Sequence, residues 1–251
     1  MCYLHSSLLT YYKVNRVFWN LHKILYRPNW IFSVVFPITL MIILGLLLGQ
    51  DFLVYGLMGI ILLVSLSSTI IPISIYLCSD KVEKRIKHYL IIKGAIWKYT
   101  RALYFVNLIM FGLVSVLLFL VSTLGFKISI DYKTVLMLIS FGFISYTFAF
   151  IIAIIIGALI NSVNDAIPLS MLIFFIIILI SGITIPLQKL IPQYYYLEVL
   201  TPFGCLYMFY SCVIGFIDLT IVEMVVAIVI IIIWILGLSY LLYIAFKSFK
   251  K

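Results

Sequence analysis

Seven long stretches of this chain contain no Asp, Glu, Lys or Arg, and they constrain its fold more than any other feature. They are 19 to 31 residues long and make up 172 of the 251 residues. A helix needs about 20 apolar residues to cross the hydrocarbon core of a bilayer, about 30 Å thick. We therefore expect most of them to lie in a membrane. They comprise residues 28–50, 52–79, 102–126, 134–164, 166–188, 199–217 and 224–246.

The spans are expected to be helices, because backbone groups in lipid must form hydrogen bonds within the protein. A transmembrane barrel would alternate apolar and polar residues, and runs such as Ile151–Ile156 and Ile228–Ile235 do not. Only 10% of the residues are charged, against about 25% in an average soluble domain. The composition excludes a cytosolic enzyme, a secreted disulfide scaffold and a disordered tail. It predicts an all-α membrane protein forming a single domain.

The positions of the basic residues predict the topology. Fourteen of the 17 Lys and Arg residues lie before the first stretch, between the second and third, or after the last. Cytoplasmic segments are rich in Lys and Arg, so both termini are expected inside, which requires an even number of spans. The basic excess is then an orientation signal and not a nucleic-acid surface. The six expected spans are residues 30–49, 53–78, 102–124, 135–160, 166–185 and 222–246.

The stretch 199–217 is the weakest candidate for a span, because it is the shortest and contains Pro202, Gly204 and Gly215. We expect residues 186–221 to form an external re-entrant or interfacial element, since broken helices are tolerated only where protein or a wet cavity surrounds them. A seventh full span is the alternative. Before the first span, residues 7–27 carry one apolar stripe at helical period and are expected to form an interfacial helix. This helix would be a lateral brace or a passive anchor.

The basic loop after the second expected span is expected to contain a short helix over residues 80–94. Asp80 would cap it, with Glu83 three residues later, and Gly94 would end it. Pairs Asp80–Lys84 and Glu83–Lys87 have the favourable i,i+4 order. The helix is either a solvated connector or a docking surface for a cytoplasmic partner.

Small and hydroxyl residues inside two expected spans are further candidates for function. Ser65, Ser68 and Thr69 share one helix face and would line a pathway or a contact between helices, the latter being favoured. Gly45 and Gly49 have the spacing of a close-packing motif and are a candidate dimer interface.

The chain carries no motif for enzyme or metal chemistry. It has no phosphate-binding loop, no His-Glu-x-x-His and no Cys-x-x-Cys. We therefore expect no catalytic residues, no metal and no cofactor in this chain.

Three segments together resemble the permease subunit of ABC-2 type ATP-binding-cassette transporters. They are Tyr26–Trp30 with Pro37, the loop from Asp80 to Tyr99, and Ser181–Pro186 followed by two further Pro-containing segments. The resemblance implies a partner ATPase that binds ATP and Mg²⁺, a second permease copy or a paralogue, and membrane lipid around them. It also implies docking of the ATPase on the loop after the second span. The expected docking residues are Glu83, Arg85, Ile86, Lys87, His88 and Tyr89.

The expected function is export of a hydrophobic or amphipathic substrate, such as a peptide toxin, a bacteriocin or a drug. A lipid-linked glycan or teichoic acid is the alternative substrate. A stand-alone secondary carrier or a non-transport immunity protein is the alternative from another class. The chain has 45 Ile and only eight Ala residues, which suggests an AT-rich genome and hence the cell membrane of a low-GC Gram-positive bacterium.

Overall fold

The computed structural model describes residues 34–48, 50–86, 95–127, 130–182 and 195–248. This part of the chain is helical, and five of its helices are long and apolar enough to cross a membrane. The expectation of an all-α membrane protein is confirmed at this level. The elements are α2 (Phe36–Leu48), α3 (Gln50–Val82), α5 (Ala95–Leu120), the π-helical turn η2 (Val121–Gly125), α6 (Tyr132–Leu159), α7 (Val163–Ile180), α9 (Tyr195–Glu198), α10 (Pro202–Ile214) and α11 (Ile221–Ser248).

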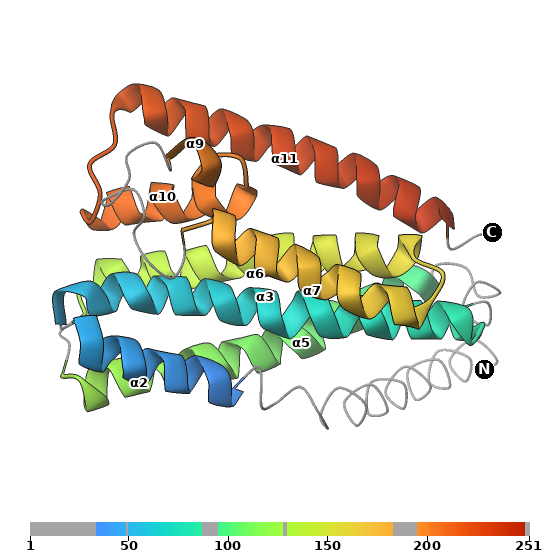
Figure 1. Ribbon diagram of the computed structural model, residues 1–251, viewed down its shortest axis with the longest axis horizontal. Helices are drawn as coiled ribbons and strands as arrows, with labels where there is room; N and C mark the ends of the chain where they lie inside the picture. The colour runs from blue at the N-terminus through green and yellow to red at the C-terminus, as the bar shows by residue number, and fades with distance from the viewer. Residues whose placement is uncertain (1–33, 49, 87–94, 128–129, 183–194, 249–251) are drawn as a thin grey trace, which may run out of the picture.

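The long helices lie side by side along one axis (Figure 1). At one end of this bundle, α3 and α6 finish and α5 and α7 begin; we call it the Asp80 end. At the other end, α3, α6 and α11 begin and α10 is found; we call it the Asp131 end. Successive long helices therefore run in opposite directions, as expected for a chain that crosses a bilayer repeatedly.

Helix α3 is the centre of the bundle. Its most apolar 18-residue window is 83% buried, against 11% for that of α11. Gly157 of α6 allows the backbone of α3 to come close, because a Cβ atom at this position would lie 2.7 Å from the carbonyl oxygen of Ser74. On a third helix, the Ser170 hydroxyl lies 2.6 Å from that of Ser74. At these two points α3 contacts its neighbours through small residues, which permit close helix packing.

Helix α10 is an independently capped short helix. Thr201 caps its start by accepting a hydrogen bond from the Gly204 backbone N–H at 2.9 Å. Gly215 ends it in the left-handed conformation, at φ 82°. Backbone bonds from Gly215 to Cys212 and from Phe216 to Ser211 complete a Schellman motif. With 13 residues, α10 is about 20 Å long at a rise of 1.5 Å per residue, which is shorter than a hydrocarbon core.

Helix α3 is longer than the expected second span, and this corrects one prediction. Asp80 lies inside α3, which continues to Val82, and is therefore not the cap of a new helix. The chain turns immediately afterwards, where Lys84 adopts a φ of 60°. The expected interfacial helix over 7–27 lies outside the described residues. The expected first span is described only from residue 34 onward, and 13 of the described residues form α2.

Candidate functional site

Asp80 is a buried carboxylate at the end of α3, and two elements supply its partners. The Tyr99 hydroxyl of α5 donates a hydrogen bond to its Oδ2 at 2.5 Å. The guanidinium of Arg85 lies 3.2 Å from its Oδ1, and the Asp80 side chain is only 2% exposed. A buried carboxylate is costly unless it is paired and hydrogen-bonded. The turn at Lys84 supplies the ion pair because it brings Arg85 back over the end of α3, although Oδ1 accepts no hydrogen bond from the described residues.

Glu83 extends this cluster to the surface. Its carboxylate accepts a hydrogen bond from the Ser79 hydroxyl at 2.9 Å and pairs with Arg85. The Ser79 hydroxyl and, after it, Arg85 hold the pKa of Glu83 below its ordinary value. The cation that pairs with Asp80 is Arg85 and not Lys84, so the predicted i,i+4 pair is wrong. Arg85 bridges the two carboxylates and fixes the turn after α3.

Lys81 joins α3 to the end of α6. Its ammonium group donates hydrogen bonds to the carbonyl oxygens of Ala158 at 2.5 Å and Ile160 at 3.3 Å. Cations near the last carbonyls of a helix are favourable because they complement its dipole. In the sequence, Lys81 is only one of the basic residues that predict the topology. Its bond to a residue 77 positions away cannot be recognised from the neighbouring sequence.

The expected docking residues fall into three groups. The side chains of Glu83 and Arg85 are 53% and 42% exposed and contact each other. Ile86 is only 5% exposed and packs in the hydrophobic core. Lys87, His88 and Tyr89 lie outside the described residues.

The hydroxyl face predicted on α3 lies in the interior of the bundle. Ser65, Ser68 and Thr69 are each less than 9% exposed. Their hydroxyls donate to carbonyls one turn earlier in the same helix, at 2.5 to 2.7 Å. Gly45 is covered within the chain, because a Cβ atom there would lie 2.3 Å from the Phe126 ring. Gly49 lies outside the described residues.

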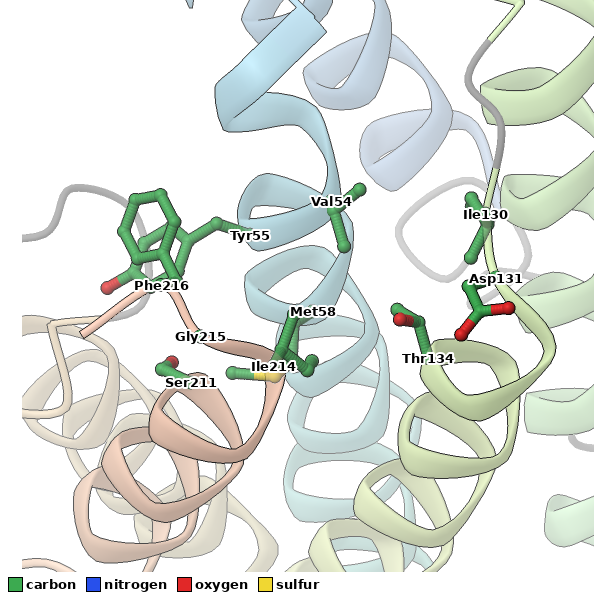
Figure 2. Close-up of a pocket in the computed structure, with 10 residues that line it drawn as sticks. All are labelled: Val54, Tyr55, Met58, Ile130, Asp131, Thr134, Ser211, Ile214, Gly215 and Phe216. Atoms are coloured by element: carbon green, nitrogen blue, oxygen red, sulfur yellow. The ribbon is translucent and has the colours of Figure 1, made fainter. Parts of the chain in front are cut away.

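A cavity of about 270 Å³ opens at the Asp131 end, between α3, the start of α6 and the end of α10 (Figure 2). Sequence reasoning did not find it, because its walls come from three segments that are distant in the chain. Most of the lining is apolar; Asp131 and Thr134 lie on the α6 side, and the Ser211 hydroxyl lies on the α10 side. The lining residues are Val54, Tyr55, Met58, Ile130, Asp131, Thr134, Ser211, Ile214, Gly215 and Phe216.

Asp131 occupies the N-cap position of α6 without using its side chain as a cap. Figure 2 shows its carboxylate beside Thr134, across the cavity from Tyr55 and Phe216. Within the described ranges, neither the Asp131 carboxylate nor the Thr134 hydroxyl has a hydrogen bond or an ion pair to protein. Ser211 is different, because its hydroxyl donates to the carbonyl of Tyr207 at 2.6 Å. The cavity therefore carries one unpaired negative charge and one unpaired hydroxyl.

A second acidic residue, Glu198, is buried near this end of the bundle and is only 2% exposed. Gly182 makes room for it, because a Cβ atom at Gly182 would lie 2.1 Å from the Glu198 carboxylate. Gly182 also has a φ of 63°, a conformation that favours glycine. The sequence shows Glu198 only as an acid between apolar stretches, without a sign of its burial.

The described part of the chain contains no group of three or more His, Cys, Asp or Glu residues able to hold a metal ion. Cys78, Cys205 and Cys212 are free thiols.

Comparisons of the chain with models of known protein families, with curated proteins and with solved structures found no match. The functional argument therefore depends on the residues and on the geometry described above.

Proposed function

We propose that the chain is the permease subunit of an ATP-driven ABC exporter that moves a hydrophobic or amphipathic substrate out of the cell. Peptide toxins, bacteriocins and drugs have this chemistry. A separate cytoplasmic ATPase would bind ATP and Mg²⁺, and a second copy or a paralogue would complete the transporter. The resemblance of three sequence segments supports the proposal. The structural observation that carries it is the fixed turn between α3 and residues 87–94.

An exporter driven by a separate ATPase needs a firm connection between the docking loop and the spans. The ion pair between Arg85 and the buried Asp80 supplies one, because it attaches the start of the loop to the end of α3. Helix α3 in turn contacts α2, α5, α6, α7 and α10. A movement of the loop would therefore reach most of the bundle through one helix.

The burial of the loop residues divides their roles in this proposal. Lys87, His88, Tyr89 and the exposed carboxylate of Glu83 would contact the ATPase. Ile86 is buried and would anchor the loop, together with Arg85. The buried side chain of Ile86 is thereby removed from the expected docking surface.

We further propose six spans, with α2 as the described part of the first and both termini in the cytoplasm. Residues 7–27 would form the interfacial helix before it. Residues 186–221 would form an external re-entrant element, and the short, capped helix α10 supports this placement. A pathway along Ser65, Ser68 and Thr69 would offer few free hydrogen-bonding groups, because these hydroxyls already bond to their own helix. This suits an apolar cargo.

The test is to purify the chain together with any ABC ATPase that is encoded beside it, in nanodiscs, and to measure ATP hydrolysis with candidate peptides. Changing Arg85→Glu together with Tyr89→Ala should abolish peptide stimulation of ATP hydrolysis. Arg101→Glu is the matched control, because Arg101 is an exposed base on α5 near the same end of the bundle. Failure of any ATPase to co-purify, or normal stimulation in the double variant, would contradict the proposal.

A further inference from the structure

The cavity at the Asp131 end has the form of a site for a small amphipathic ligand. Its volume of about 270 Å³ is close to the lower limit of ligand pockets, which range from about 300 to 1,000 Å³. One wall is apolar and aromatic, with the rings of Tyr55 and Phe216 stacked at a centroid distance of 4.1 Å. The opposite wall carries Asp131 and Thr134 (Figure 2). A ligand that fills the cavity must therefore be apolar on one side and polar on the other.

The polar wall selects the charge of this ligand. A carboxylate only accepts hydrogen bonds, whereas the Thr134 hydroxyl can accept as well as donate. An ammonium group carries three donors and no acceptor, so it can satisfy both side chains at once. Two lysines, Lys127 and Lys133, lie close to Asp131 in the sequence, but neither forms an ion pair with it in the described structure. The negative charge is thus available to a ligand.

Asp131 is exposed at the start of α6, and a negative charge at this position also complements the helix dipole. It stands at the N-cap of α6, yet its side chain makes no capping hydrogen bond. Ser, Thr, Asp and Asn at this position usually bond the backbone N–H groups of the first turn. Here the carboxylate lines the cavity instead.

We propose that this cavity binds an organic cation: an ammonium group held by Asp131 and Thr134, on an apolar stem that lies against Met58, Tyr55 and Phe216. The site is formed by this chain alone and does not depend on a partner ATPase. It is therefore separate from the function proposed above, and it is tested without nucleotide.

The probe is radiolabelled n-octylammonium, and binding is measured by equilibrium dialysis against the full chain in zwitterionic nanodiscs, with empty nanodiscs subtracted. n-Octanol and n-octanoate have the same stem and different head groups. Asp131→Asn removes the charge and keeps the shape. Asp218→Asn is the matched control, since Asp218 is exposed in the loop after α10 and does not line the cavity.

We expect saturable binding of n-octylammonium, about tenfold weaker binding to the Asp131→Asn variant, and unchanged binding to the Asp218→Asn variant. n-Octanol should bind weakly and equally to all three proteins, and n-octanoate should not bind. Thr134→Phe, which fills the cavity, should abolish binding while far-UV circular dichroism remains that of the wild type. Three results would each overturn the proposal: no saturable binding, equal losses in the two Asp variants, or preferred binding of n-octanoate.

Discussion

At the scale of single residues, Asp80 has the most consequential environment, because it is buried and depends on two partners from different segments. Replacing it with Ala would remove the acceptor of the 2.5 Å bond from the Tyr99 hydroxyl and one of the two carboxylates that pair with Arg85. Removing one partner of a buried pair costs about 3–5 kcal/mol, and the partial exposure of Arg85 reduces this. We expect Asp80→Ala to lower the free energy of unfolding by about 1–3 kcal/mol, measured by SDS titration in detergent micelles.

Tyr99→Phe is the graded control for this prediction, because it removes only the hydroxyl that donates to Asp80. It should cost about 1 kcal/mol, the net value of one hydrogen bond. Wild-type resistance to SDS in the Asp80→Ala protein would show that the cluster does not stabilise the turn after α3.

Gly157 leads to a second prediction at this scale. A Cβ atom there would lie 2.7 Å from the Ser74 carbonyl oxygen and equally close to the Leu77 Cβ, so α3 and α6 would have to separate. Forced overpacking costs about 1–3 kcal/mol, and Gly157→Ala should destabilise the chain by this amount in the same SDS titration. Gly237→Ala is the matched control, because nothing lies within 4 Å of its Cβ position on α11. Equal effects of the two variants would refute the close-approach argument.

At the scale of elements, hydropathy predicted the long helices well, because length and apolarity decide whether a helix can span a membrane. Their ends were predicted less well. Asp80 and Glu83 match a helix start, but α3 continues through Asp80, whose carboxylate accepts a hydrogen bond from Tyr99 and pairs with Arg85 inside the fold. The start of α11 has a capping box that its sequence shows but that we did not predict. The Glu223 carboxylate accepts a hydrogen bond from the Thr220 backbone N–H, and the Thr220 hydroxyl accepts one from the Glu223 backbone N–H.

Helix α10 provides the prediction for this scale. Thr201 accepts a bond from the Gly204 N–H, and its hydroxyl lies 3.1 Å from that of Ser181. Losing an N-cap costs about 0.5–2 kcal/mol, so Thr201→Ala should destabilise the chain by that amount in an SDS titration. Thr201→Ser keeps the oxygen and should restore most of the stability. If Ser and Ala behave alike, the capping bond does not hold the start of α10.

At the scale of the whole molecule, the long helices differ sharply in burial. Helices α7 and α11 are 17% and 11% buried over their apolar windows, so most of their side chains need lipid or another protein to cover them. The composition predicted this apolar surface, but it could not predict the cavity at the Asp131 end. That site depends on how three segments pack, and a packing arrangement leaves no pattern in any single segment.

The topology is the prediction that involves the whole chain. Asp218 precedes α11 and Lys247 lies in its last turn, so single cysteines at these positions must lie on opposite sides if α11 crosses the membrane. With an impermeant maleimide and intact cells, Asp218→Cys should react, whereas Lys247→Cys should react only after permeabilisation. An N-terminal reporter should also be cytoplasmic, because four basic residues precede the first expected span and cytoplasmic segments are rich in Lys and Arg. Five crossings alone would place the two termini on opposite sides of the membrane. If both termini are cytoplasmic, the chain must cross once more, and we assign this crossing to the segment containing α2.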